Sequence, residues 1–348
     1  MRGEPDFDTP DCIREACMRA MKDGMTHYTH SLGLLELREA ICEHYAGRYK
    51  VNCTPDRVII TSGTSPAMLL MFAAMLERGD EIIISDPHYA CYPNFISFFE
   101  GVPVPVNVLE EDGFQYRPEA IKKKLSPKTK GIMINSPSNP TGNLLSPERM
   151  KEIAALGVTV ISDEIYHGLV YEDEEHSILE YTDNAFVLNG FSKAYAMTGW
   201  RLGYLIAPKK YVRPIQKIQQ NLFICANSFV QWGGIAALRE AGADVERMRG
   251  IFDERRKYII KRLDTIGLGI AVAPTGAFYV LANIKSFSND SYATAFDILQ
   301  KAHVGVTPGI DFGPNCEGYI RFSYANSIEN IAEGLDRIER YLKQVTNV

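Results

Sequence analysis

Short apolar segments alternate with longer segments of helical pattern over residues 57–207. Six of the apolar segments have the length of buried strands. They lie at residues 58–60, 81–84, 131–134, 158–161, 186–188 and 204–206. Helical patterns at 66–77 and 147–156 fall between several of them. Because strands that alternate with helices form βαβ units, the pattern predicts an α/β fold with a mainly parallel sheet.

The pattern changes beyond this region. A charged helical segment at 245–263 predicts a long helix with one face in solvent. Short strand patterns follow at 278–280 and 319–322, and helical patterns occupy 293–302 and 328–345. This order of elements predicts a second, smaller α+β domain.

Length, charge and cysteine usage limit the classes of protein to consider. The chain has 348 residues, of which 46% are hydrophobic and 23% charged, as in a globular protein with room for two domains. Its net charge of −6 argues against nucleic acid as a partner. We find no apolar run of about 18 residues and no signal peptide, so a membrane is not expected. The seven cysteines lack metal-ligand spacing, which predicts a cytoplasmic protein with reduced thiols and no metal site.

Residues 191–201 carry the strongest chemical signal in the chain. Lys193 comes just past the apolar strand at 185–188, and open α/β sheets bind their ligands at that edge. Its amine could bind an aldehyde cofactor covalently. Ser192 and Arg201 would then hold a phosphate, for which the planar guanidinium is well suited. A lone lysine is more often a solvated surface residue, but the neighbouring serine and arginine favour the chemical interpretation.

Two further charged residues occur in apolar strand patterns. Asp163 follows the strand at 158–162, where an isolated aspartate more often caps the next helix. Arg321 lies within the apolar segment 319–323, and a buried arginine needs an anionic partner. That partner is either a bound carboxylate or a nearby acidic residue, and the residues alone leave both alternatives open.

The segment around Lys193 resembles the cofactor-lysine motif of the fold-type I aminotransferases, the aspartate aminotransferase superfamily of class I and II. The match consists of Ser192-Lys193 followed, from Thr198, by Thr-Gly-Trp-Arg-x-Gly-Tyr. The resemblance extends from the segment at 3–10 to the C-terminus. It implies that pyridoxal 5′-phosphate is the cofactor.

The resemblance also implies the architecture. A fold-type I protein has a large cofactor domain with a mainly parallel, seven-stranded sheet flanked by helices, here expected at 14–242. The small α+β domain would combine residues 1–13 with residues 243–348. Members of this family form homodimers that share their active sites.

The implied activity is transfer of an amino group from an L-amino acid to a 2-oxo acid in a ping-pong cycle. Lys193 would hold the cofactor and, once displaced by the amino acid, act as general base and acid. Asp163 would keep the cofactor's ring nitrogen protonated, because an opposite charge favours the charged form. Tyr166 would bind the phenolic oxygen of the ring.

Asn139 is assigned to the same ring oxygen and to the substrate. Taken alone, Asn139-Pro140-Thr141-Gly142 would be interpreted as a turn. In the family, the peptide bonds that match Ser136-Pro137 and Asn139-Pro140 tend to be cis.

A glycine-bearing turn before the helical pattern at 66–77 is expected to bind the cofactor's phosphate. Free N–H groups and the positive end of the helix dipole favour an anion there. Short turns of this composition are common, so the assignment of Gly63, Thr64 and Ser65 to the phosphate rests on the resemblance.

Four more residues receive roles from the resemblance. Tyr89 would stack on the cofactor ring, although a core aromatic is nearly as good an interpretation. Arg321 would clamp the substrate's α-carboxylate, and Gly3 would also contact the substrate. Tyr28 would reach the phosphate of the neighbouring subunit, so that two chains build each site.

The chain departs from the family's pattern in three places. A helix and a strand that usually precede the 3–10 segment are missing, and the stretch between Asn139 and Asp163 is slightly short. At Ser65 some members that act on acidic substrates carry a lysine. Preference for aspartate is therefore open, as are aromatic, aliphatic and alanine-type donors.

Other functions remain to be weighed against transamination. A β-eliminating C–S lyase would use the same fold and cofactor. A non-catalytic regulator that binds pyridoxal phosphate would normally carry a basic DNA-binding domain, which we do not find. A serine hydrolase is disfavoured because the segment 190–194 lacks the second glycine of a nucleophile elbow.

Overall fold

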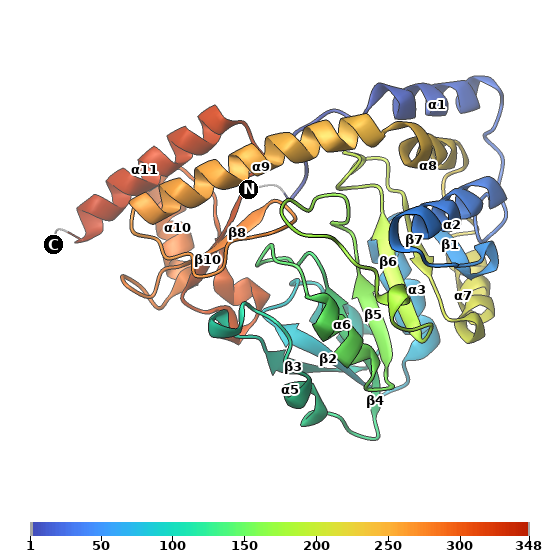
Figure 1. Ribbon diagram of the computed structural model, residues 1–348, viewed down its shortest axis with the longest axis horizontal. Coiled ribbons are helices and arrows are strands. Elements are labelled where there is room, and N and C mark those ends of the chain that lie inside the picture. Colours follow the sequence, from blue (N-terminus) through green and yellow to red (C-terminus); the bar gives the residue numbers. More distant parts are fainter. Residues whose placement is uncertain (1–2, 347–348) are drawn as a thin grey trace.

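The computed structural model describes residues 3–346, which form a seven-stranded central sheet and a smaller three-stranded sheet (Figure 1). The central strands are β1 (Val58–Thr61), β2 (Glu81–Asp86), β3 (Val102–Asn107), β4 (Thr129–Asn135), β5 (Thr159–Asp163), β6 (Ala185–Gly190) and β7 (Gly203–Ile206). Their order across the sheet is β1-β7-β6-β5-β4-β2-β3. Strand β7 is antiparallel to both neighbours and every other pair is parallel, which confirms the predicted mainly parallel sheet.

Strand β3 at the edge of this sheet was not among the strands predicted from the apolar pattern. Its sequence contains Pro103 and Pro105, which lack the N–H group needed for pairing on both sides. A strand with such residues is tolerated at an edge, where only one side is paired. The prolines therefore explain why this strand was not predicted. A strand with these residues can lie only at the edge of the sheet.

Helices cover both faces of the central sheet. They are α1 (Asp11–Lys22), α2 (Leu35–Tyr49), α3 (Thr64–Met75), α4 (Tyr92–Phe98), α5 (Pro118–Lys122), α6 (Pro147–Ala154), α7 (Lys209–Leu222) and α8 (Ser228–Glu240). Helices α2, α5, α6 and α8 contribute to the core on one face, and α3, α4 and α7 to the core on the other. Successive strand residues point to opposite faces, so Ile60 lies in the first core and Ile59 in the second.

Helix α3 begins two residues before the predicted start at Pro66. Its N-cap residue Gly63 has φ 102°, a left-handed conformation that side chains disfavour. Pro66 is compatible with the first turn of a helix, where N–H groups have no intrahelical partner. The turn at Gly63 therefore leads directly from β1 into the helix.

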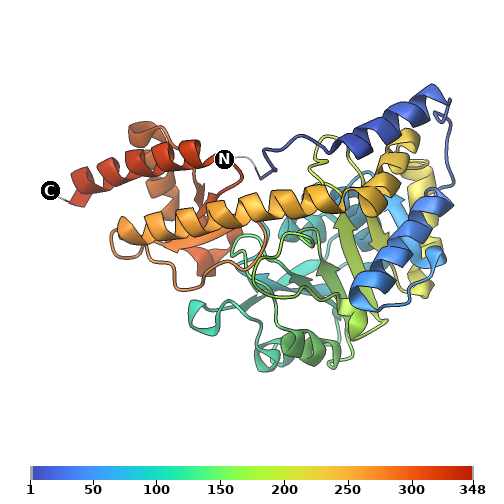
Figure 2. The ribbon, with the colours of Figure 1, turned by 45° about the horizontal axis from the view of Figure 1, so that its top comes forward.

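The smaller sheet has the order β8-β10-β9, with all pairs antiparallel. Its strands are β8 (Tyr279–Asn283), β9 (Thr307–Pro308) and β10 (Tyr319–Ser323), and two helices of the same part of the chain are α10 (Ser291–Ala302) and α11 (Ile328–Thr346). The 24-residue helix α9 (Gly242–Thr265) runs from α8 to this part of the chain (Figures 1 and 2).

Helix α9 and the N-terminal segment both pack against the smaller sheet and its helices α10 and α11. Phe252 of α9 lies in one core with β8, β10, α10 and α11. Phe7 packs edge-on against Phe252 with ring centroids 5.1 Å apart, and Arg255 forms an ion pair with Asp6. These contacts agree with grouping residues 1–13 with 243–348, but the domain limits stay a prediction.

Within residues 3–346, no helix combines the length and apolarity needed to cross a bilayer. Over the same residues, no cluster of histidine, cysteine, aspartate and glutamate side chains could hold a metal ion.

Candidate active site

A cavity of about 480 Å³ lies at the carboxyl-terminal ends of β4, β5 and β6. Most of the residues singled out from the sequence line it: Gly3, Thr64, Ser65, Tyr89, Asn139, Asp163, Tyr166, Ser192, Lys193, Arg201 and Arg321. Gly63 is adjacent to the lining, whereas Tyr28 lies outside it. The structure therefore gathers residues from both parts of the chain around one space.

Lys193 follows β6 and points its amine into the cavity. The amine donates a hydrogen bond to the carbonyl oxygen of Gly3 across 2.6 Å. Burial, and next the positive charge of Arg201, lower the pKa of Lys193 to about 8. An amine with such a pKa is partly uncharged near neutral pH, which is the form that acts as nucleophile or base.

Arg201 reaches the turn at the start of α3 because that turn lacks a side chain. A Cβ atom on Gly63 would lie 2.7 Å from Nη2 of Arg201. Nη1 donates to the carbonyl oxygen of Thr198 across 2.9 Å, which fixes the guanidinium. Thr64 and Ser65 occupy the first turn of the 12-residue helix α3, so their N–H groups have no intrahelical partner. This end of the cavity therefore offers several donors to an anion.

Asp163 ends β5 at the bottom of the cavity and is 4% exposed. Tyr92 donates its O–H to Oδ2 across 2.7 Å, and the backbone N–H of Ile165 donates to Oδ1 across 3.2 Å. Burial raises the pKa of Asp163 to about 6, although both hydrogen bonds oppose that shift. A positive charge placed beside this carboxylate would offset its loss of water.

Asn139 is held in the loop after β4 by its own strand. Its backbone N–H donates to Oδ1 of Asn135 across 2.8 Å, and the Asn135 amide donates to the carbonyl oxygen of Asp163 across 2.9 Å. The peptide bonds Ser136-Pro137 and Asn139-Pro140 are both cis, as predicted. A third cis bond, Asp86-Pro87, was not predicted.

Arg321 in β10 brings the smaller part of the chain to the cavity. Nη1 donates to Oδ1 of Asn139 across 2.7 Å, and Nη2 donates to Oγ1 of Thr307 across 3.1 Å. The guanidinium lies 4.2 Å from the ring centroid of Tyr279 and 4.9 Å from that of Phe312. Among residues 3–346 no acidic side chain forms an ion pair with it, and the buried Nε has no hydrogen-bond partner. The free donor favours a bound carboxylate over an internal ion pair.

Several residues of the cavity were not identified from the sequence. Tyr92 binds Asp163, and its ring centroid lies 5.4 Å from that of Tyr89, the residue predicted to stack on the cofactor ring. Tyr279 accepts a hydrogen bond from the Tyr166 hydroxyl across 3.2 Å. Glu4 lines the cavity and accepts a hydrogen bond from Thr198 across 3.2 Å. The sequence contains no local signal for these contacts, because each one joins distant segments.

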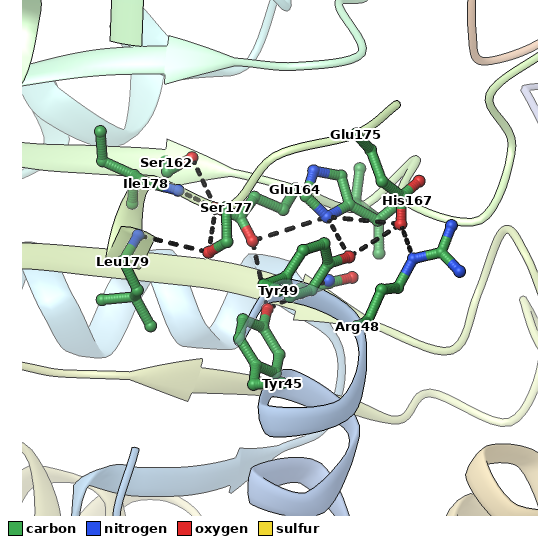
Figure 3. A network of polar contacts seen from close by, with 12 residues as sticks. Tyr45, Arg48, Tyr49, Ser162, Glu164, His167, Glu175, Ser177, Ile178 and Leu179 are labelled. Carbon is green, nitrogen blue, oxygen red and sulfur yellow. Dashed lines mark hydrogen bonds and ion pairs between the residues drawn. The ribbon is translucent and has the colours of Figure 1, made fainter. Parts of the chain in front are cut away.

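A buried polar network surrounds Glu164 and His167, which follow Asp163 in the chain (Figure 3). Glu164 is fully buried, and its Oε1 accepts hydrogen bonds from the Ser162 and Ser177 hydroxyls and from the Ile178 N–H, at 3.0 to 3.1 Å. Its Oε2 accepts a hydrogen bond from the Tyr45 hydroxyl across 3.2 Å. Burial raises the pKa of Glu164, but His167 and the hydrogen bonds from Ile178, Ser177 and Ser162 oppose the shift.

The same network continues through His167 to helix α2. Nδ1 of His167 lies 2.7 Å from the Tyr49 hydroxyl and 3.7 Å from Oε2 of Glu164. Glu175 accepts hydrogen bonds from Tyr49 and from Arg48 and binds the backbone N–H of Gly168. Contacts of Glu164 and His167 (Figure 3) and of the Gly168 N–H thus fix the segment after β5, whereas Asp163 and Tyr166 of the same segment line the cavity.

Tyr28 lies between α1 and α2 and is 79% exposed. It makes no contact with the cavity of its own chain. Its predicted role requires a second chain and stays a prediction.

The residues around the cavity fit pyridoxal phosphate. The start of α3, Ser192 and Arg201 would hold its phosphate, and Asp163 would face its ring nitrogen. Because Gly63 has no side chain, the guanidinium of Arg201 can lie against the turn at the phosphate end. Lys193 would hold the aldehyde, with its pKa already lowered.

Comparison with known proteins gives an independent assignment. Residues 2–338 match the family model of aminotransferase class I and II. The chain is 42% identical to the (5-formylfuran-3-yl)methyl phosphate transaminase of Methanocaldococcus jannaschii over 98% of this chain and 90% of that protein. It is also 42% identical to an aspartate aminotransferase of Pyrococcus horikoshii over 98% of this chain and 89% of that one.

Solved structures agree with these relatives. The crystal structure of an aromatic aminotransferase from Pyrococcus horikoshii OT3 has a TM-score of 0.96 and 38% identity, covering 100% of this chain and 96% of that one. Thermus thermophilus aspartate aminotransferase with maleate has a TM-score of 0.94 and 37% identity, covering 97% and 90%. The chain therefore belongs to the class I and II aminotransferases, and it is a fold-type I transaminase of amino acids that uses pyridoxal phosphate.

Proposed function

We propose that Lys193 is the residue that binds the cofactor and moves the substrate's α-proton. The observation that carries this proposal is the position of its amine in one cavity with a buried carboxylate, Asp163, and an arginine, Arg321, that pairs with no acidic side chain of residues 3–346. Pyridoxal phosphate, when bound, withdraws electrons from the α-carbon of an amino acid. The protein's task is then to orient the substrate and to supply a base.

Each residue of the cavity has a defined part in this task. Arg321 binds the substrate's α-carboxylate through its planar donors, with Asn139 and Thr307 fixing the guanidinium. Nζ of Lys193, whose pKa is about 8, accepts the α-proton and later gives it back. Asp163 keeps a proton on the ring nitrogen, and Tyr92 orients the carboxylate.

The remaining cofactor contacts follow from the same arrangement. Asn139 and Tyr166 bind the phenolic oxygen of the ring, and Tyr89 packs against the ring face. Ser65 and Thr64 bind the phosphate together with Ser192 and Arg201. Gly3 contributes its backbone to the substrate side, where its carbonyl oxygen already binds Lys193.

We propose donors with neutral side chains, aromatic or aliphatic, in preference to aspartate. Three cationic side chains line the cavity in residues 3–346: Lys193, Arg201 and Arg321. Each one has a role in binding the cofactor or the α-carboxylate. Ser65 carries no charge, so the part of the chain that the structure describes offers no further cation at the cavity for a second substrate carboxylate.

Borohydride reduction tests the assignment of Lys193. Reduction of the protein with pyridoxal phosphate should attach the cofactor to the peptide that contains Lys193. Attachment at another lysine, or none, contradicts the proposal.

Amino donors are then compared by the loss of the cofactor's yellow absorbance, with 2-oxo acids restoring it. A higher kcat/KM for aspartate than for phenylalanine or leucine contradicts the proposed preference, and pyruvate release from cysteine without an oxo acid indicates β-elimination.

We further propose a homodimer in which Tyr28 reaches the partner's phosphate site. Tyr28 lies in the segment that follows α1, and the Ser228 hydroxyl of α8 donates a hydrogen bond to the carbonyl oxygen of Met25 in the same segment across 3.0 Å. Exposed apolar side chains occur in the same region: Met25, Leu35, Leu222, Phe223 and Ile224. A second copy would cover them. If light scattering gives the mass of a monomer under conditions in which the enzyme is active, this proposal is contradicted.

A cytoplasmic location is part of the same proposal. All seven cysteines are free thiols, which is usual in a reducing compartment. Cell fractionation tests it.

A further inference from the structure

Two thiols lie side by side outside the active-site cavity. The sulfur of Cys42, in α2, is 3.1 Å from the sulfur of Cys53, in the segment between α2 and β1. Cys42 is half-buried and Cys53 is buried. Both side chains pack into the same core cluster as the central sheet.

The surroundings of the pair favour one reactive thiolate. The hydrogen bond with Cys42 lowers the pKa of Cys53; burial opposes this, and the positive charge of Arg57 adds to it. The same hydrogen bond raises the pKa of Cys42. Because a thiolate is the nucleophile in disulfide exchange, Cys53 is the thiol prepared to react and Cys42 is the neighbour that can resolve the product.

The pair joins two elements that support the active site. Helix α2 provides Tyr45 and Tyr49 to the network behind Asp163. The segment after Cys53 continues into β1 and then into the turn at Gly63. A cross-link between Cys42 and Cys53 would therefore tie α2 to the strand that leads to the phosphate end of the cavity.

We propose that Cys42 and Cys53 are a modification site that closes reversibly to an intrachain disulfide, with a low-molecular-weight disulfide as the oxidant. The Cys53 thiolate attacks one sulfur of glutathione disulfide, whose S–S bond breaks and releases a glutathione thiolate. The Cys42 sulfur loses its proton to that thiolate or to water and attacks the Cys53 sulfur. A second glutathione thiolate leaves, so two thiols and one glutathione disulfide give one protein disulfide and two glutathione molecules.

The cross-link should stabilise the fold without changing the cavity. A disulfide restricts the unfolded chain, and this one closes a short loop between residues 42 and 53. For a chain of this size we expect the oxidised protein to melt roughly 2–5 °C above the reduced protein. Dithiothreitol should reverse the change.

Mass spectrometry of the folded holoenzyme tests the proposal. Treatment with glutathione disulfide, followed by alkylation, should give a protein that has lost two hydrogen atoms, about 2 Da, and carries two fewer alkyl groups. Peptide mapping without reduction should then recover the peptides of Cys42 and Cys53 joined. Cys42→Ser and Cys53→Ser should each abolish both the mass loss and the rise in melting temperature. Cys12→Ser, in helix α1, should leave both unchanged.

Three results would overturn the inference. The first is full alkylation of Cys42 and Cys53 after treatment of the wild-type protein. The second is a stable glutathione adduct on the wild-type protein in place of the cross-link. The third is a disulfide that joins a different pair of cysteines in the peptide map, a result that does not depend on how the variants fold.

Discussion

Arg321 and Asn139 are joined by a hydrogen bond of 2.7 Å from Nη1 of the arginine to Oδ1 of the asparagine. The arginine belongs to β10 of the smaller sheet and the asparagine to the loop after β4 of the central sheet. This contact places the proposed carboxylate clamp beside the proposed ring ligand. One pair of hydrogen-bonded side chains therefore includes both the residue proposed to bind the substrate and a residue proposed to contact the cofactor.

Substitution of Arg321 should weaken substrate binding. Arg321→Lys keeps the charge but loses the planar pair of donors, so kcat/KM for the amino donor should fall about 10- to 100-fold, mainly through KM. Arg321→Gln should lose more. Arg337, an exposed arginine paired with Glu333, provides the control Arg337→Gln, which should leave KM unchanged. Stopped-flow measurement of the donor half-reaction checks the prediction, and an unchanged KM in Arg321→Lys would count against the clamp.

Lys193→Ala should remove both the covalent attachment and the base. The rate of the donor half-reaction should fall by at least roughly 10²- to 10⁴-fold, the usual contribution of a positioned base. The cofactor should also be lost on dialysis. Lys257→Ala is the matched control, because Lys257 is exposed and paired with Asp253 on α9. Retention of wild-type turnover by Lys193→Ala would refute the assignment.

Asp163→Asn should stabilise the apoprotein while abolishing activity. The pKa of Asp163 is about 6 in the folded chain and 3.8 in the unfolded one. Ionisation of Asp163 therefore lowers the free energy of unfolding by its full amount above pH 6 and does not change it below pH 3.8. At pH 7.5 the asparagine variant should be more stable by roughly 3 kcal/mol, and the gain should shrink as the pH falls through 6.

Urea denaturation of the apoprotein at pH 5 and pH 7.5 measures this difference. Asp336→Asn is the control, since Asp336 is a surface residue that pairs with Arg262. Equal stability of Asp163→Asn and wild type at pH 7.5 would mean that Asp163 carries no such cost.

Lys193 gives the opposite dependence on pH. Its pKa is lowered from 10.5 to about 8, so between these values the unfolded chain holds a proton that the folded apoprotein lacks. Stability should therefore rise from pH 8 toward pH 10 by up to roughly 3 kcal/mol, relative to a Lys193→Met variant. Denaturation of both apoproteins over this range checks the slope. A constant difference between them would contradict the prediction.

Gly63→Ala should weaken the cofactor's phosphate site. The new Cβ would lie 2.7 Å from Nη2 of Arg201 and would force the guanidinium away from the turn. Gly63 also has φ 102°, so the substitution adds backbone strain of about 1–3 kcal/mol. The Kd of pyridoxal phosphate should rise about tenfold or more.

Gly24→Ala separates strain from contact. Gly24 has φ 76°, also left-handed, but nothing lies within 4 Å of its added Cβ. The control should therefore lose stability while the Kd of the cofactor stays the same. Equal changes of Kd in the two variants would show that strain alone is responsible.

Glu164→Ala should destabilise the fold because it leaves four buried donors without their acceptor. We expect a loss of about 3–5 kcal/mol in the free energy of unfolding. Glu164→Gln keeps an acceptor oxygen and should lose less. Glu152→Ala, at an exposed pair with Arg149, is the surface control. Chemical denaturation measures all three, and a loss in Glu164→Ala no greater than in the control would show that the network contributes little.

Local patterns were sufficient for much of the molecule. Six central strands and the long helix α9 follow from short segments whose own residues specify them, whereas the two cis bonds after β4 were expected from the family resemblance. The motif around Lys193 also indicated the cofactor, because a lysine, a serine and an arginine at fixed spacing match the needs of a phosphorylated aldehyde. Strand β3 was not predicted, because prolines are tolerated in a strand only at the edge of a sheet. No local pattern shows which strand will lie at an edge.

The sequence by itself determined most of the strands and helices and the residues that we propose to carry the chemistry. Only the tertiary structure decided that Tyr92 binds Asp163, that Tyr279 meets Tyr166, and that no acid pairs with Arg321 within residues 3–346. Secondary structure depends on neighbours along the chain, whereas a buried polar contact depends on which distant segments the packed core brings within about 3 Å. That selection is made by the whole fold, so it could not be predicted from any single segment.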